Sequence, residues 1–326
     1  MSKQYTIEKV GLGEAWDRFI MSTPDCTVFA RSTYLANSGC RVGTYHCFNS
    51  GELRAAIVLV ESDDGSAAVL DDLVVYSGIF FGAPTNGQNP SQQMSERFEL
   101  ASFIAEWMAS VYSAIEFALP PSVIDIRPFL WFNYGQDTGR YKVDVRYTSV
   151  LEINDFATAE KLEDVAAYAL CSSARRQQIR YARRDEVVTE EFSDVGLFAD
   201  FYQQTMGRQG EQVPPKKMDD MANLIQALLL NGMARMFVSR DHQGAAGSVA
   251  VYAIDRHQAC YLFGANDPNL RNTPTGTAVL WDAFTPLAKG GIATIDLEGV
   301  NSPRRGWFKL SFGGNLTSYY QITLNR

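Results

Sequence analysis

The sequence predicts an α+β fold made of two copies of one structural unit. At 326 residues the chain is long for a single hydrophobic core, which favours two domains. Alternating apolar residues and helical periodicity occur in both halves, separated by Gly, Pro and Asn turns. The order hairpin, strand, helix, strand occurs in the first half and again in the second. We therefore expect two tandem domains, each with a mixed, mostly antiparallel sheet flanked by helices.

The first copy is expected between residues 45 and 132. Residues 45–65 predict a hairpin of two strands around a Ser-Gly turn, and residues 71–84 a third strand that ends at Gly and Pro. Residues 95–115 carry apolar side chains at helical spacing, which predicts an amphipathic helix. Residues 122–132 are then expected to begin as a strand.

The second copy follows the same order. The expected elements are a hairpin at 234–255, a strand at 258–267, a helix at 276–289 and a strand at 293–299. Asp125 and Asp296 occupy matching places in the last strand of the two copies, as expected for a duplicated fold. We place the domain boundaries at 1–150 and 151–314.

Composition excludes some classes of function. A formal net charge of -8 and a pI near 5.0 argue against a protein whose main function is to bind nucleic acid. The five cysteines are widely spaced without metal-ligand spacing, so we interpret them as reduced thiols and predict no metal site. Neither a signal core nor an apolar run long enough for a bilayer occurs, so we expect a cytoplasmic protein without a membrane partner.

An ordered set of motifs resembles the tandem GNAT acyltransferases of the Fem-like family. The motifs in the second half are RQQIRYARR (176–184), FYQQTMGRQG (201–210), the stretch 267–284, DLEG (296–299) and FKLSFGG (308–314). DIRPFLWFNY (125–134) and RYTSVLEI (146–153) extend the likeness into the domain junction. The resemblance implies two GNAT-like domains, and that the final strand can return to the first, so that residues 315–326 complete its sheet.

The resemblance also implies an acyl transfer. Members that use aminoacyl-tRNA often carry a long charged helical arm, and none is evident between Phe192 and Arg235. The other donor of the fold is acyl-coenzyme A, and no Ser or Cys has a nucleophile-elbow context, so we expect direct attack by an amine. The expected reaction moves an acetyl or short hydroxyacyl group, such as 3-hydroxybutanoyl, to the amino sugar of a UDP or dTDP sugar for surface polysaccharide synthesis. The alternatives are a tRNA-dependent transferase acting on a peptidoglycan precursor and a non-catalytic binding module.

In a GNAT domain the turn before the central helix holds the diphosphate of coenzyme A at the helix N-terminus. The corresponding residues here are 266–278, with Arg271 as a charge partner and Gly276 and Thr277 at the helix start. A loop that merely begins a helix is the alternative. The matching loop of the first half, residues 82–96, is a rival site that we interpret as a plain connection.

Glu298 is the expected general base of the reaction. Strand alternation places it on the same side as Asp296, at the end where the fold separates its strands. A carboxylate there can also pair with Arg304 or Arg305 of the following loop.

Lys309 lies among aromatic and glycine residues, and a cation there needs water or an anionic partner. In the family that it resembles, a lysine at this place meets the diphosphate of a nucleotide-linked sugar, and Gly313 and Gly314 would permit close approach. The alternative is a lysine on an edge strand that reaches solvent.

Other polar groups are candidates for acceptor binding. Asp125 and Arg127 either form an ion pair or contact the ligand, and Trp131 and Tyr134 can stack on a base or sugar ring. Two further candidates follow an apparent helix and either line the acceptor pocket or cap that helix: Arg208 and Gln209.

A basic stripe occurs in the motif at 176–184. Arg176, Arg180 and Arg183 or Arg184 recur at helical spacing, so they share one face. Most such stripes are solvated, and three nearby glutamates could neutralise this one: Glu186, Glu190 and Glu191. The alternative is that one of the arginines reaches the ligand cleft.

Overall fold

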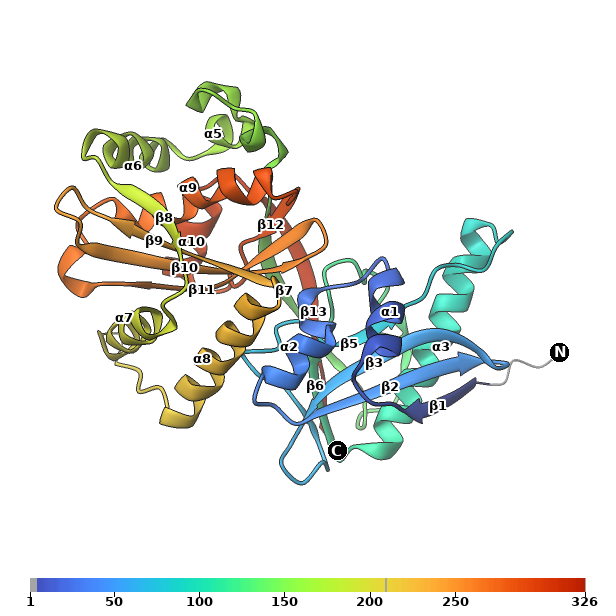
Figure 1. Cartoon of the computed structure of the whole chain (residues 1–326). Coiled ribbons are helices and arrows are strands. Elements are labelled where there is room, and N and C mark those ends of the chain that lie inside the picture. The colour runs from blue at the N-terminus through green and yellow to red at the C-terminus, as the bar shows by residue number, and fades with distance from the viewer. Residues whose placement is uncertain (1–4, 209, 326) are drawn as a thin grey trace. The chain divides into compact units, whose positions relative to one another are not determined.

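The computed structural model describes residues 5–208 and 210–325 (Figure 1). They form two compact units. The first unit runs up to Arg146 and also contains the end of the chain from Ser318, and the second unit is Tyr147–Thr317. In the described chain no helix is long and apolar enough to cross a membrane. None of the five cysteines forms a disulfide there.

The first unit is built on a sheet with the strand order β1-β2-β3-β4-β6-β13, and β5 pairs with β3. β4 and β6 run parallel, and the other printed pairs in this unit are antiparallel. The chain's last strand pairs with β6, so the end of the chain completes this sheet. The strands are β1 (Tyr5–Lys9), β2 (Val42–Asn49), β3 (Glu52–Glu61), β4 (Ala68–Val69), β5 (Gly78–Phe81), β6 (Ala114–Ala118) and β13 (Asn315–Asn325). The helices are α1 (Glu14–Ser22), α2 (Ser32–Asn37), α3 (Pro90–Val111) and α4 (Arg127–Trp131), with the 3-10 turn η1 (Val28–Ala30).

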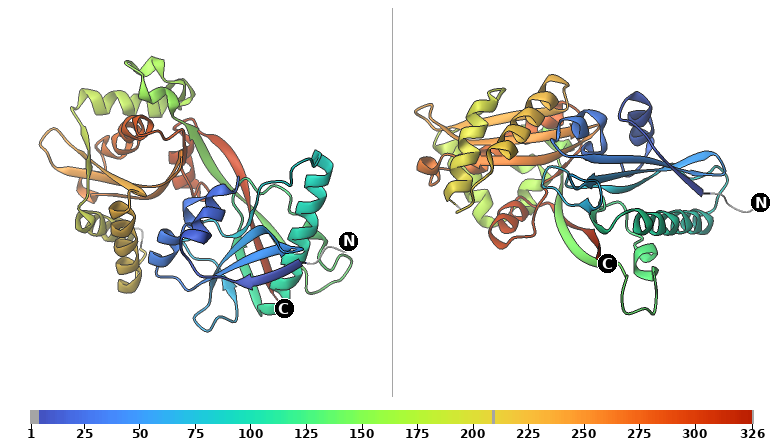
Figure 2. Two further views of the ribbon diagram at one scale, coloured as in Figure 1. Left: turned by 45° about the vertical axis from the view of Figure 1, so that its right-hand side comes forward. Right: turned by 90° about the horizontal axis from the view of Figure 1, so that it is seen from below.

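Helices cover both faces of this sheet, with α1 and α2 on one side and α3 on the other (Figure 2). The buried side of α3 packs Leu100, Ile104 and Met108 into a cluster with Ile57 and Phe117 of the sheet. These residues are fully or almost fully removed from water, which is the main favourable contribution to folding. The first unit therefore has a hydrophobic core of its own.

The second unit has the strand order β7-β12-β11-β10-β9-β8, in which only β11 and β12 pair in parallel among the described strands. The strands are β7 (Lys142–Glu152), β8 (Val188–Phe192), β9 (Ala234–Arg240), β10 (Ala246–Asp255), β11 (Gln258–Asn266) and β12 (Thr294–Asp296). The longer helices are α6 (Ser173–Arg184), α7 (Val195–Arg208), α8 (Pro215–Leu230), α9 (Thr275–Lys289) and α10 (Pro303–Leu310). Shorter pieces are η2 (Asn154–Ala157), η3 (Leu162–Asp164), α5 (Ala166–Leu170) and η4 (Pro268–Leu270).

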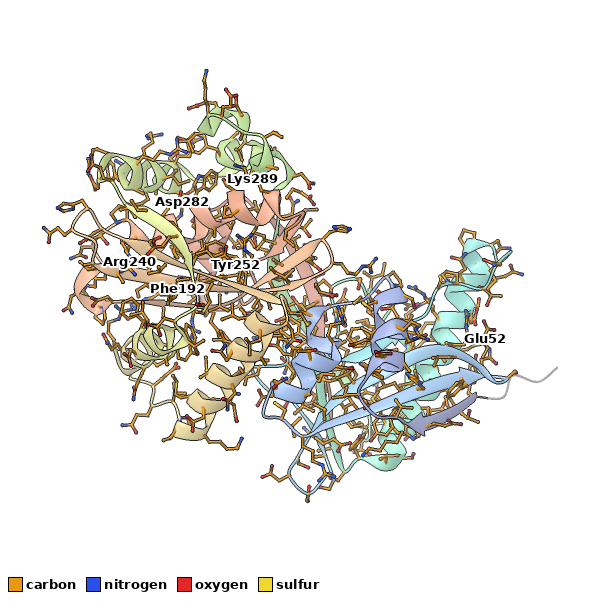
Figure 3. The ribbon with its side chains drawn as sticks, viewed as in Figure 1. Glu52, Phe192, Arg240, Tyr252, Asp282 and Lys289 are labelled. Atoms are coloured by element: carbon orange, nitrogen blue, oxygen red, sulfur yellow. The ribbon has the colours of Figure 1, made fainter. Side chains whose placement is uncertain are left out.

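The two faces of the second sheet are covered by different helices. α6 and α9 lie on one face, and α7 and α8 lie on the other (Figure 1). On the α9 face, Phe284 and Leu287 pack with Tyr252 of β10, which lies within the sheet (Figure 3). α8 buries Leu224 and Leu228, so the described residues between Phe192 and Arg235 include helices that pack within the domain.

The repeated order of elements is present in both units. It reads β2, β3, β5, α3, β6 in the first unit and β9, β10, β11, α9, β12 in the second, which confirms the predicted hairpins, the helix at 276–289 and the strand at 258–267. The prediction for residues 122–132 is wrong, because Arg127–Trp131 is the helix α4 with a Pro in its first turn. The last strand of the first copy is instead β6, so Asp125 does not match Asp296. The helix expected at 95–115 begins earlier, at Pro90, and ends at Val111.

The glycine pair of FKLSFGG is required by packing inside the second unit. Gly313 has a φ of 88°, and a Cβ there would lie 2.7 Å from the Cβ of Leu170 and 3.1 Å from the carbonyl oxygen of Ala167. A Cβ at Gly314 would overlap the Ser149 hydroxyl of β7. The close approach expected for a phosphate is thus already made by the chain itself.

Gly313→Ala is expected to destabilise the protein by roughly 2 kcal/mol or more, since it adds both a clash and a left-handed backbone penalty. Gly244→Ala is the matched control, because Gly244 has a φ of 82° and no atom within 4 Å of an added Cβ. That control isolates the backbone penalty, which is about 1 kcal/mol. Urea unfolding of both variants measures the difference, and equal losses would contradict the packing role of Gly313.

Candidate active site

Two parallel strands of the second unit separate in the middle of the sheet. β11 and β12 pair at Gln258↔Thr294, Ala259↔Ile295 and Cys260↔Asp296. β12 ends at Asp296, whereas β11 continues to Asn266. We call this divergence the strand fork: the Cys260↔Asp296 pair together with the two segments that leave it. Beyond it, the described part of β11 has no β12 residue beside it, so an edge of the strand is open to a partner.

Asp296 shapes the turn that leaves β12. It is buried, and its Oδ1 accepts hydrogen bonds from the Thr148 hydroxyl and, at 2.8 Å, from the backbone N–H of Glu298. A carboxylate that accepts from the backbone two residues further on stabilises a turn and fixes the next side chain. Through this hydrogen bond Asp296 positions Glu298.

Glu298 lies in the loop after β12 and not on the strand, which corrects the predicted alternation with Asp296. Its φ is 45°, a left-handed conformation that redirects its side chain. The expected pairing with Arg304 or Arg305 stays a prediction. Lys309 forms an ion pair with Glu298, with its Nζ 3.8 Å from Glu298 Oε2.

Lys309 lies on the helix α10 and not on an edge strand, and its side chain is only 12% exposed. Its Nζ donates to the carbonyl oxygen of Glu298 at 2.5 Å and lies 5.2 Å from the ring centroid of Tyr261. Burial lowers the pKa of Lys309, and the Glu298 carboxylate opposes that shift. A buried cation held 3.8 Å from its carboxylate is incompletely compensated.

Tyr261 is a residue of the fork that the sequence interpretation missed. It is the first residue of β11 beyond the Cys260↔Asp296 pair, and burial raises the pKa of its phenol. Its hydroxyl lies over Gly264, where a Cβ would overlap it. In the sequence, Tyr261 is marked only by its place in a predicted strand, and that does not distinguish it from other tyrosines in strands.

The helix α9 begins next to the fork without a side-chain cap. Its N-cap residue is Pro274, and no described hydrogen bond uses the N–H groups of Thr275 and Gly276. Gly276 faces Asn266 Oδ1, which would lie 3.2 Å from an added Cβ. Free N–H groups at the start of a 15-residue helix favour an anion. Arg271 is exposed in the preceding turn, and Thr277 accepts a hydrogen bond from Arg175 Nη1.

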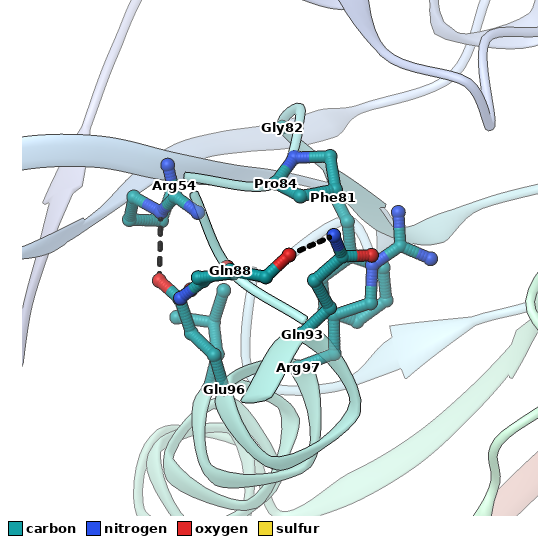
Figure 4. Close-up of a pocket in the computed structure, with 9 residues that line it drawn as sticks. Arg54, Phe81, Gly82, Pro84, Gln88, Gln93, Glu96 and Arg97 are labelled. Carbon is teal, nitrogen blue, oxygen red and sulfur yellow. Dashed lines mark hydrogen bonds and ion pairs between the residues drawn. The ribbon is translucent and has the colours of Figure 1, made fainter. Parts of the chain in front are cut away.

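The matching loop of the first unit is closed by its own side chains (Figure 4). Asn89 and Gln92 form a capping box at the start of α3, whose N1 residue is Pro90. Glu96 accepts from Arg54 at 2.9 Å and from Gln88 at 2.6 Å in the pocket beside this loop. Glu96 therefore already occupies the donors of Arg54 and Gln88, as expected for a plain connection.

Four of the predicted binding residues lie together in the first unit. Asp125 accepts two side-chain hydrogen bonds from Arg127, at 2.8 and 2.6 Å, and these lower the pKa of Asp125. The Arg127 guanidinium lies 5.5 Å from the ring centroid of Trp131, and the side chain of Tyr134 is 78% exposed. The ion-pair alternative thus describes Asp125 and Arg127, while both aromatic rings stay accessible.

The remaining candidates are separate from the fork in sequence. Arg208 is exposed at the end of α7. Gln209 lies outside the described residues. In the described chain no group of three or more His, Cys, Asp or Glu side chains could hold a metal ion.

Known proteins share this architecture. Residues 171–304 match the family described as "Acetyltransferase (GNAT) domain". A comparison with curated proteins finds no match. The structure is similar to FemX, with a TM-score of 0.65, 14% identity and 96% of each chain covered. It is similar to a tandem GNAT protein from the clavulanic acid biosynthesis pathway, with a TM-score of 0.53, 8% identity and 98% of each chain covered.

A third similar structure is the C-terminal domain of a putative lysylphosphatidylglycerol synthetase from Agrobacterium fabrum, with a TM-score of 0.54 and 13% identity over 95% of this chain and 90% of that one. At these identities the structures show the fold alone. The predicted fold of two tandem GNAT-like domains is confirmed. The family match to residues 171–304 supports the predicted reaction class, an acyl-coenzyme A-dependent N-acyltransferase.

The charge of Lys309 is expected to respond in opposite directions to two substitutions. Glu298→Gln should lower the pKa of Lys309 further, because the carboxylate favours the ammonium form. Arg305→Gln should raise it, because the Arg305 charge opposes that form. Reductive 13C-methylation followed by NMR titration reads the lysine directly. Shifts of the same sign in both variants would contradict this arrangement of charges.

Proposed function

We propose that the protein transfers an acyl group from acyl-coenzyme A to the amine of a UDP- or dTDP-linked amino sugar, with the chemistry at the strand fork of the second unit. The acyl group is acetyl or a short hydroxyacyl such as 3-hydroxybutanoyl. The product class fits surface polysaccharide synthesis in the cytoplasm. The observation that carries the proposal is the uncapped start of α9 beside the fork.

The donor is assigned to the second unit by the contrast between its two matching helices. α9 leaves the N–H groups of Thr275 and Gly276 free, whereas α3 uses a capping box and a proline at the same place. A diphosphate binds best where N–H groups have no other partner. We therefore assign the coenzyme diphosphate to the free N–H of Gly276, with Thr277 next to it in the same turn and Arg271 as a charge partner, and assign none to α3.

The reaction needs a neutral amine, an oriented thioester and a place for the proton. Attack forms a C–N bond and breaks the C–S bond, and the coenzyme leaves as a thiolate. Glu298, held by the turn that Asp296 organises, is the proposed acceptor of the amine proton. Its side chain is 25% exposed, so substrate and water can reach it.

Lys309 is the proposed contact for the diphosphate of the sugar nucleotide. Burial already lowers its pKa, and a phosphate oxygen would restore the charge balance that Glu298 gives only at 3.8 Å. Four residues of the first unit stay predicted ligand contacts in their own right: Trp131 and Tyr134, whose rings are accessible, and Asp125 and Arg127, which pair with each other. Arg208 and Gln209 remain proposed acceptor contacts.

A tRNA-dependent transfer to a peptidoglycan precursor is the second candidate, and one observation favours it. Two of the three glutamates expected to neutralise the arginines of α6 pair elsewhere, since Glu190 pairs with Arg240 and Glu191 pairs with Arg235. A basic helix suits a nucleic acid backbone. Retention of aminoacyl-tRNA on a filter, set beside thiol release from acyl-coenzyme A with UDP and dTDP amino sugars, separates the two candidates.

Glu298→Gln is expected to lower kcat for acceptor-dependent thiol release by roughly 10²- to 10⁴-fold, because it removes the base. Lys309→Ala should instead act mainly on KM for the sugar nucleotide, because it removes a phosphate contact. Arg304→Gln is the control, since Arg304 is an exposed residue of the helix α10 that also carries Lys309. Unchanged turnover in both site variants would refute the assignment of these residues.

Gly276→Asp tests the donor site without removing a binding group. A carboxylate in the first turn of α9 favours the helix and occupies the place of the diphosphate. We expect a KM for acyl-coenzyme A that rises about tenfold or more. The Tm is measured alongside, because Asn266 Oδ1 must move away from the added Cβ. Ser91→Asp makes the same change in the first turn of α3 and should leave KM unchanged. Equal effects of the two changes would argue against a site specific to α9.

A further inference from the structure

Arg175 is a buried cation at the start of α6. Arg175 is 9% exposed, and its guanidinium lies against the rings of Phe308 and Phe312, at 4.3 and 4.4 Å from their centroids. Nε donates to the Ser311 hydroxyl at 2.9 Å, and Nη1 donates to the Thr277 hydroxyl in the first turn of α9. One side chain thus joins the helices α6, α9 and α10.

No carboxylate compensates this charge in the described chain. Arg175 forms hydrogen bonds only to hydroxyls, and burial lowers its pKa to about 10. A buried charge without an opposite charge is costly, and the two phenyl rings offset only part of that cost. Among the acidic residues that follow α6, Asp185 pairs with Arg184, and Glu190 and Glu191 pair with arginines of β9. The site therefore favours an anion that the chain does not supply.

The guanidinium lies in the wall of an open groove between α6 and α10. Its polar lining includes Ser172, Gln178 and Ser311, and its apolar lining includes Leu170, Trp307 and Phe308. The lining contains no acidic residue. The Trp307 residue is 74% exposed, an unusual place for so large an aromatic side chain. The groove therefore suits a nucleotide. The cation, the hydroxyls and the amide can bind its phosphate, and the exposed aromatic ring can stack on its base.

We propose that this groove binds the 3′-phosphoadenosine end of the acyl-coenzyme A donor, with the 3′-phosphate at Arg175 and the adenine on Trp307. The inference rests on the proposed function for its choice of donor. The hydrogen bond from Arg175 to Thr277 supports that choice, because it places this cation beside the turn assigned to the diphosphate of the same molecule. A single ligand can then meet both anion sites.

Calorimetric titration of the whole protein with adenosine 3′,5′-bisphosphate tests the groove without any acyl transfer. We expect adenosine 5′-monophosphate, which lacks the 3′-phosphate, to bind about tenfold more weakly or worse. Arg175→Gln and Trp307→Ala should each weaken binding of the bisphosphate by a similar factor. Arg184→Gln changes an exposed arginine of the same helix that pairs with Asp185, and it should have no effect.

Arg175→Gln can disturb the fold because it joins three helices, whereas Trp307 is exposed, so Trp307→Ala keeps the test decisive. Bisphosphate binding that is equal in all variants, or absent in the native protein, overturns the proposal. Turnover of acyl-coenzyme A in that case leaves the proposed function intact and rejects only the groove. Binding of an oligonucleotide ending in CCA, lost in Trp307→Ala and without bisphosphate binding, also overturns it.

Discussion

The separation of β11 from β12 is the constraint on which the rest of the second unit depends. A parallel pair normally continues as long as both strands do, but here the Asp296 carboxylate accepts the N–H of Glu298 and turns the chain away. The turn gives Glu298 a left-handed backbone and leads into α10, which returns Lys309 to the same place. The edge of β11 thereby stays open beside a carboxylate and an ammonium group. A continuous β12 would cover all three.

Much of this fold could be predicted from the sequence because its signals are local. The hairpin around Ser50 and Gly51 needs two successive positive φ angles, and the helix from Thr275 follows from apolar spacing. The prediction of a strand at 122–132 was wrong because its apolar residues lie in a loop and in a short helix. That helix begins at Arg127 and has Pro128 in its first turn. Periodicity cannot distinguish these cases in so short a segment.

The candidate site was predicted only in part, for a different physical reason. Glu298 and Lys309 were both identified, but their mutual contact depends on a turn and a helix that sequence spacing does not encode. Arg175 was left out of the basic stripe because it shares the buried face of α6 with Ile179 and Ala182. The sequence did contain a signal for Arg175, because it lies at helical spacing from these two apolar residues. A cation on a buried helix face requires a partner, which marks it as a candidate.

The uncapped start of α9 affects the local stability of the helix when no ligand is bound. Helix starts without a cap are less stable by about 1 kcal/mol than capped ones, so the first turn of α9 should open more readily than that of α3. An anion that binds there acts as the missing cap. Binding of the donor and ordering of this turn are then thermodynamically coupled, so that each stabilises the other. The donor completes the N-terminal cap of α9 that the chain itself lacks.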